Sequence, residues 1–200
     1  LYMDDNTKAI EYANLVIDSD RYELLTTNDY KTYFWLTPDN NSETIFAIRH
    51  MLEDNRDKAS IGSMYYSDAT GTSGWGQMYA SLDFMRLLNR YPEDARHNFI
   101  EIQLATNGVD TIKRNNVPKF FVNKYSWQEG AVNLSSPVYI RLAEMYLNRA
   151  EANAKLGNDQ LAIDDVNVIR VRAGLAGTAL YTVDDLKGHG STLDVVLEER

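Results

Sequence analysis

Apolar residues recur every three or four positions in two stretches of the chain, residues 7–19 and residues 138–156. This spacing gathers apolar side chains on one face of a helix, so both stretches are predicted to be helical. Gly157 is expected to end the second helix, because glycine readily adopts the left-handed conformation found just after helix C-termini. A further helix is predicted to follow, capped by Asp159 and ended by Gly174.

In other stretches successive residues alternate in character, which predicts short strands, and turn residues mark where these strands begin or end. Residues 44–49 alternate and contain Ile and Phe, which favour strands. Residues 100–104 and 120–122 are predicted to pair as a small hairpin, because the Asn-Gly pair at 107–108 is a hairpin-type turn. Another helix is expected to begin at Ser81.

The least regular stretch is residues 54–80, where glycines interrupt any periodicity and large aromatic residues lie among them. A loop of this composition must either order its aromatic rings against the rest of the protein or expose them for use. The glycines are Gly62, Gly71, Gly74 and Gly76.

The two helices around Gly157 resemble a tetratricopeptide repeat. Ala150, the Leu-Gly-Asn turn at 156–158 and Ala162 lie at the offsets usual in that repeat. Antiparallel helices approach closely only where both present small side chains at the crossing. Residues 9–13 look like the second half of another such repeat, with a long non-repeat insertion between the two. The predicted fold is therefore mainly α, with tetratricopeptide-like helix pairs (an α/α superhelix) and an irregular, loop-rich insertion that contains a little β.

Several runs of residues resemble a narrower family. Residues 137–152, PVYIRLAEMYLNRAEA, resemble the SusD/RagB signature, and residues 167–175, NVIRVRAGL, are close to the family pattern N-x-[IV]-R-x-R-A-G-L. The final residues 197–200 resemble the start of the family's next motif. Weaker matches precede them in the right order, at residues 40–48, at Asp94-Ala95-Arg96, and at residues 119–125 with Lys124.

The resemblance covers nearly the whole chain but only the middle-to-late part of a typical member. We expect residues 1–200 to form a single, partial domain of this type. Residues 1–25 and 137–175 would be its helical scaffold, and residues 40–130 its loop-rich ligand face. A last helix, capped by Ser191 or Thr192, is predicted to run to the final residue without C-terminal punctuation. More chain is therefore expected to follow.

The resemblance implies a function and a location. Members bind glycans without cleaving them at the outer surface of Bacteroidetes-type bacteria, where they are lipid-anchored to the outer membrane. They sit as a lid over a SusC-like TonB-dependent transporter and deliver the glycan to it. The anchoring Cys would lie upstream of Leu1, so the chain would meet the membrane only through that anchor.

Sugar binding requires flat aromatic faces with polar groups nearby, and the irregular loop contains these residue types. Trp75 is the first candidate, because its neighbours Gly74 and Gly76 are small enough to let a ligand approach the ring. The alternatives are that Trp75 pins the loop to the rest of the protein and that Trp127 packs in the core. The expected glycan-binding residues are Trp75, Tyr65, Tyr66, Asp68, Tyr79 and Trp127.

Charge and composition exclude several other functions. The net charge is −9 with a pI of about 4.8, so the chain should repel nucleic acid and anionic membrane surfaces. It contains no Cys, which excludes disulfides, thiolate metal sites and a Cys nucleophile within it. No His pair has metal-ligand spacing. We expect neither a metal nor another cofactor.

Two other functions remain open. A tetratricopeptide adaptor would bind a peptide in its groove. A glycoside hydrolase would need two carboxylates about 5–10 Å apart. Acidic residues are plentiful, but none stands out among candidates such as Asp4, Asp5, Asp54 and Asp68. The chain is therefore expected not to be an enzyme and to have no catalytic residues.

Other conspicuous residues are expected to be structural. Trp35 is predicted to lie in the core, and His189 in a solvent-exposed Gly-His-Gly loop. Charged residues of the two adjacent helices are expected to fix helix register. They are Arg141, Glu144, Arg149, Glu151, Arg170 and Arg172.

Overall fold

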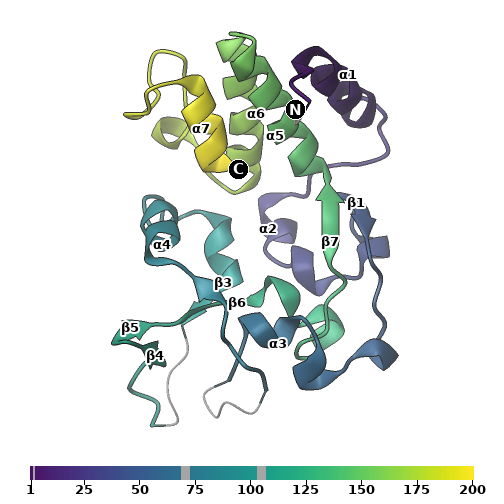
Figure 1. Cartoon of the computed structure of the whole chain (residues 1–200), viewed down its shortest axis with the longest axis vertical. Helices are drawn as coiled ribbons and strands as arrows, with labels where there is room; N and C mark the ends of the chain where they lie inside the picture. The colour runs from purple at the N-terminus through teal and green to yellow at the C-terminus, as the bar shows by residue number, and fades with distance from the viewer. Residues whose placement is uncertain (2, 69–72, 103–106) are drawn as a thin grey trace. The chain divides into compact units, whose positions relative to one another are not determined.

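The computed structural model describes residues 1, 3–68, 73–102 and 107–200. They fall into two compact units, and the chain passes from one unit to the other more than once. The helical unit consists of Leu1–Thr27, Ser42–Phe46 and Ile140–Arg200. The loop-rich unit consists of Asn28–Asn41 and Ala47–Tyr139. Figure 1 traces the chain from its purple N-terminus to its yellow C-terminus.

The helical unit contains the long helices of the fold. They are α1 (Asn6–Ile17), α5 (Leu142–Lys155), α6 (Asp159–Arg172) and α7 (Thr192–Glu199), with the 3-10 turn η8 (Gly177–Ala179). Helix α5 packs against α1 and α6, and α7 covers α5 and α6, as Figure 1 shows. Helix-on-helix packing of this kind confirms the mainly α prediction.

Small residues allow the close crossing of α5 and α6. Ala150 of α5 and Ala162 of α6 are both fully buried in one apolar cluster. The cluster also contains Ile163, Val166, Tyr181, Val195 and Val196, so α7 is anchored on the same core. Burial of the two alanines is what the tetratricopeptide-like spacing predicts.

The helix predicted at residues 138–156 starts later than expected, so the predicted start is wrong. Val138–Arg141 forms the strand β7, which pairs with β1 (Thr44–Ala47), and α5 begins only at Leu142. The apolar residues before Leu142 fit the helical spacing, but Val and Ile are β-branched and favour an extended backbone. Pairing with a strand nearly a hundred positions earlier favours the strand over the helix here. The local spacing of apolar residues contains no information about such a distant partner.

The helix ends follow the predicted chemistry with one exception. Gly157 has φ +78°, and the Asn158 N–H donates to the Asn153 carbonyl over 2.9 Å, so α5 ends in a Schellman motif. Gly174, with φ +90°, ends α6 in the same way. Asp159 is not the cap of α6: it is the first residue of that helix and Asn158 precedes it as N-cap.

Helix α7 begins as predicted. Ser191 is its N-cap and accepts a hydrogen bond from the Asp194 N–H. A capping hydroxyl of this kind satisfies one of the free N–H groups of the first turn.

The charged residues of the helical unit are structural, as expected. Arg149 of α5 donates to Asp165 of α6 over 2.7 and 2.9 Å and to Asn14 of α1 over 2.6 Å, so one guanidinium joins these helices. The hydrogen bond to Asp165 raises the pKa of the Arg149 guanidinium above its ordinary value. Arg172 pairs with Glu43 over 2.8 Å, and both side chains are buried.

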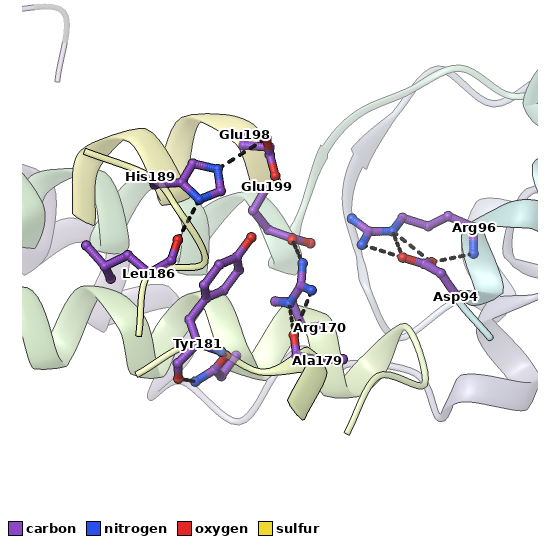
Figure 2. Close-up of polar contacts among 10 residues, drawn as sticks. Asp94, Arg96, Arg170, Ala179, Tyr181, Leu186, His189, Glu198 and Glu199 are labelled. Atoms are coloured by element: carbon purple, nitrogen blue, oxygen red, sulfur yellow. Dashed lines mark hydrogen bonds and ion pairs between the residues drawn. The ribbon is translucent and has the colours of Figure 1, made fainter. Parts of the chain in front are cut away.

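Around Arg170 lies a second buried network, shown in Figure 2. Arg170 donates to Glu199 of α7 over 2.7 Å and to the Ala179 carbonyl, and it lies 4.6 Å from the centre of the Tyr181 ring. The Gly-His-Gly loop is solvent-exposed at both glycines, as predicted, but the His189 ring itself is largely covered. Its ring nitrogens lie 2.7 Å from the Leu186 carbonyl oxygen and 3.2 Å from a Glu198 carboxylate oxygen.

The loop-rich unit is built from short elements. Its helices are α3 (Gly62–Tyr65) and α4 (Leu82–Leu88), and α2 (Thr27–Tyr30) lies at its edge. Its 3-10 turns are η1 (Tyr33–Trp35), η2 (Pro38–Asn40), η3 (Leu52–Asp54), η4 (Asp57–Ala59), η5 (Ala95–Phe99), η6 (Asn123–Tyr125) and η7 (Gln128–Gly130). Ser81 caps α4 by accepting a hydrogen bond from the Phe84 N–H, which confirms the predicted start of that helix.

Two small antiparallel sheets lie in this unit. The strands β2 (Tyr79–Ala80), β6 (Phe120–Val122) and β3 (Ile100–Ile102) form one sheet in that order. β4 (Lys113–Arg114) and β5 (Val117–Pro118) form the other. The predicted pairing of β3 with β6 is confirmed, with Ile100 opposite Val122. A second hairpin lies between them, so the turn at 107–108 does not join them directly; Leu104 lies outside the described residues.

Aromatic residues form the core of the loop-rich unit. The rings of Tyr30 and Phe34 meet the Phe99 ring edge to face, at centroid distances of 5.1 and 5.0 Å. Tyr33 is also fully buried. The prediction that Trp35 is a core residue is wrong, because 36% of it is exposed. The 3-10 turn η1 directs Tyr33 inward and leaves the residue two positions later at the surface.

Candidate functional site

Trp75 is both fixed and exposed. Its Nε1 donates to the Lys58 carbonyl over 3.0 Å, and its backbone N–H donates to the Ser63 carbonyl over 2.7 Å. The Lys58 Nζ lies 5.3 Å from the ring centroid. Even so, 54% of the residue is exposed. The indole edge therefore pins the loop, while much of the ring remains open to a ligand.

The glycines beside Trp75 are required by the packing of the loop. A Cβ on Gly74 would collide with the Tyr66 carbonyl. A Cβ on Gly76, which has φ +51°, would lie 2.5 Å from the Phe121 ring. The two glycines let the chain on either side of Trp75 pass close to the Tyr66 backbone and the Phe121 ring. The expectation that these small residues also let a ligand approach the indole stays a prediction.

Tyr65 and Tyr79 line a shallow pocket of about 310 Å³ in the same unit. The Tyr65 ring lies 4.5 Å from the Tyr125 ring, which fixes its tilt. Lys119 lies 5.7 Å from the centre of the Tyr79 ring and donates to the Gly76 carbonyl over 3.0 Å. Both tyrosines are half-buried, so each offers part of its ring to the pocket.

The remaining predicted residues are placed differently. Tyr66 is only 6% exposed, and its ring packs against Phe121 and, at 5.6 Å, against Trp127. Its ring therefore has no open face and packs in the interior of the loop-rich unit. Trp127 is half-buried and has φ +71°. The backbone N–H of Asp68 donates to the Ser73 hydroxyl over 2.7 Å.

A second pocket, of about 450 Å³, was not predicted from the sequence. His50, Asp54, Arg56 and Tyr139 are among the residues that line it. These residues come from segments that lie up to ninety positions apart in the chain. No periodicity or motif brings such segments together, so only the fold could reveal this pocket.

Carboxylate side chains are scarce in the lining of these two pockets. Within the described ranges, no three His, Asp or Glu side chains gather as a metal-ligand set. The pocket of Tyr65 and Tyr79 has no carboxylate in its lining, and the second pocket has one, Asp54. A pair of carboxylates is what glycoside hydrolysis ordinarily requires. In the part of the chain that the structure describes, no helix is both long and apolar enough to span a bilayer.

The family model for the SusD family matches residues 5–200. The chain belongs to the SusD family. The resemblance drawn from the helical motifs is thereby confirmed, and the half-buried Arg149 and the buried Arg170 and Arg172 lie within those SusD motifs. A comparison with curated proteins gives no match.

Solved structures show the same SusD fold. A SusD superfamily protein from Bacteroides thetaiotaomicron is 27% identical, with a TM-score of 0.73 over 98% of this chain. One from Bacteroides vulgatus is 26% identical, with a TM-score of 0.72 over the whole chain. Surface glycan-binding protein A from Bacteroides uniformis has the same fold at 23% identity, with a TM-score of 0.62 over 97% of the chain. The chain spans 42% of the length of each of these proteins.

Proposed function

We propose that this SusD-family chain binds a glycan at the bacterial cell surface without breaking it. The observation that carries the proposal is the exposed indole of Trp75, which is held by its edge in an otherwise well-packed loop. Tyr65 and Tyr79, in the neighbouring pocket, would contact further sugar residues. Tyr66 and Trp127 would support these rings, and the Asp68 carboxylate would accept a hydrogen bond from a sugar hydroxyl group.

The physical basis is stacking on a ring that is already in place. The C–H face of a pyranose is apolar and packs on an aromatic face, while its hydroxyl groups need polar partners nearby. Because hydrogen bonds from Trp75 to Lys58 and Ser63 already orient the indole, little side-chain entropy is lost on binding. The helical unit, with its buried ion pairs, would be the scaffold of the fold and the loop-rich unit its ligand face.

The location and partner are part of the proposal and rest on family membership. A SusD-family protein of this kind would be lipid-anchored at the outer face of the outer membrane. It would deliver its glycan to a SusC-like TonB-dependent transporter. The net charge of −9 argues against nucleic acid as a further partner.

Affinity electrophoresis tests the site. Wild type is run through gels that contain one of four neutral polysaccharides: an α-glucan, a β-glucan, a galactomannan or a xylan. We expect at least one to retard it and Trp75→Ala to lose that retardation. Trp35→Ala is the matched control, because Trp35 is an exposed Trp of the same unit outside the pockets.

Two outcomes would count against the proposal. Equal retardation of wild type and Trp75→Ala would remove Trp75 from the site. Release of reducing sugar from any of these polysaccharides on incubation would show hydrolysis, and the protein would then be an enzyme rather than a binding protein.

A further inference from the structure

The second pocket has rigid walls drawn from three separate segments of the loop-rich unit. Ile48 and His50 follow β1, residues 54–61 include η4, and residues 133–139 precede the helical unit. Gln128, which is 1% exposed, ties two of these segments together. Its Nε2 donates to the His50 carbonyl over 3.0 Å, and its Oε1 accepts from the Ser136 N–H over 2.7 Å. The pocket is therefore formed before any ligand arrives.

The pocket offers both a hydrogen-bond acceptor and a set of donors. His50 Nδ1 lies 2.9 Å from the Ser135 carbonyl oxygen, so this nitrogen carries a proton. In the neutral ring, Nε2 is then an acceptor, and it has no partner among the residues that the structure describes. Within the same residues, the Arg56 guanidinium makes no ion pair or hydrogen bond. The pocket can thus both accept a hydrogen bond from a hydroxyl group and donate one to it.

An acceptor in the pocket wall is also unsatisfied. Asn133 is 2% exposed, and its side-chain nitrogen donates to the Ser73 carbonyl. Its Oδ1 is buried and has no hydrogen-bond partner in the described part of the chain. A buried acceptor of this kind is usually satisfied by an ordered water, which would lie in the pocket wall.

The rim of the pocket is apolar and aromatic. Tyr139 is 59% exposed, and Ile48 and Ile61 beside the opening are also exposed. One fixed positive charge, on Arg56, and one fixed negative charge, on Asp54, cancel within the lining. An anionic sugar would therefore gain no net attraction. An aromatic face with a few uncommitted hydrogen-bonding groups and no net charge matches a neutral pyranose.

We infer that this pocket is a second site for a neutral sugar residue, separate from the Trp75 ring. The inference rests on the proposed function, since it concerns the same glycan. The η4 turn connects the two sites: Lys58 accepts the hydrogen bond from Trp75, and Ala59, the next residue, lines the pocket. A chain of several sugar residues can then engage both places at once, and the two contacts reinforce each other.

Binding to the polysaccharide that retards wild type tests the second site. We expect Tyr139→Ala and Arg56→Gln each to weaken binding of that neutral polysaccharide roughly tenfold. Arg56 is exposed, so Arg56→Gln should fold even if Tyr139→Ala disturbs β7. Tyr12→Ala is the matched control, because this equally exposed tyrosine of α1 lies outside the loop-rich unit and should bind like wild type.

The possible results separate the two proposals. Retardation that is lost in Trp75→Ala but unchanged in both Tyr139→Ala and Arg56→Gln would overturn the second site alone. Loss of retardation in Tyr139→Ala and Arg56→Gln, with no loss in Trp75→Ala, would support the second site and exclude Trp75 from the glycan-binding site. Retardation only by a polyuronate, run in parallel, would overturn the neutral-sugar assignment. A wild type that none of these polysaccharides retards would overturn both proposals.

Discussion

The helical unit and the loop-rich unit of this SusD-family chain are stabilised by different kinds of contact. Helices α5, α6 and α7 satisfy most of their own backbone groups, and buried ion pairs such as Arg172–Glu43 add to the packing of this unit. The loop-rich unit has little regular structure, and buried side chains such as Gln128 hydrogen-bond the backbone of its irregular segments. Where a chain lacks regular structure, its buried N–H and C=O groups need such partners.

This difference has a consequence for function. Residues that hold helices together recur at regular spacing, and they produce the family motifs in the sequence. Residues that hold a loop in place are specific to that loop. On the proposed function, the loop-rich unit would present the ligand surface, and the helical unit, which carries the family motifs, would support it.

The largest expected effect is a loss of stability in the helical unit. Arg172→Ala would leave the Glu43 carboxylate buried without its guanidinium, and this should lower the free energy of unfolding by about 3–5 kcal/mol. Urea denaturation measures the change. Arg86→Ala is the control, since Arg86 pairs with Asp83 at the surface and should lose about 1 kcal/mol or less. Equal losses in the two variants would show that the buried pair has no special role.

A smaller effect is expected in the loop-rich unit. Gly76→Ala would place a Cβ against the Phe121 ring at a left-handed φ, which should cost about 1–3 kcal/mol and also weaken glycan binding. In contrast, Gly190→Ala meets no atom nearer than 3.4 Å and should change stability by about 0.5 kcal/mol or less. Thermal unfolding with a parallel binding assay measures both effects. A Gly76→Ala protein as stable as wild type would contradict the role assigned to this glycine.

The smallest effect concerns pH and the start of α1. The Lys8 N–H donates to Asp5 over 3.1 Å, and this hydrogen bond holds the pKa of the Asp5 carboxyl below its ordinary value. Because the folded-state pKa is depressed, the cap stabilises α1 at neutral pH, and its contribution is lost as the pH falls through that pKa. Asp5→Ala should therefore lower the melting temperature at neutral pH, with a difference that shrinks in acid.

Asp5→Asn is the control for this prediction. Asn is a good N-cap without a titrating carboxyl, so this variant should keep most of the stability at both pH values. A difference between wild type and Asp5→Ala that persists unchanged in acid would show that the carboxylate is not what stabilises α1.

Much of the helical unit could be predicted from the sequence, because its determinants are local. The helix ends at Gly157 and Gly174 and the crossing of Ala150 with Ala162 follow from residue type and spacing. The strand before α5 was missed, because its conformation depends on pairing with the distant β1.

The candidate site was predictable only in its residue types. The sequence indicated that Trp75 lies in an aromatic, glycine-rich loop, but not that Tyr66 of the same loop is buried. It also gave no sign of the contact between His50 and Ser135, which helps to form the second pocket. Contacts between irregular segments far apart in the chain leave no periodic pattern in a single sequence.

Fluorescence of a single-tryptophan protein tests the central claim most directly. Trp35→Phe and Trp127→Phe together would leave Trp75 as the only indole of the chain. On titration with oligosaccharides from the polysaccharide that retards wild type, a sugar stacked on this exposed ring should shift its emission to shorter wavelength, with saturation. Emission that stays unchanged while the same protein is still retarded by that polysaccharide would show that the glycan binds elsewhere.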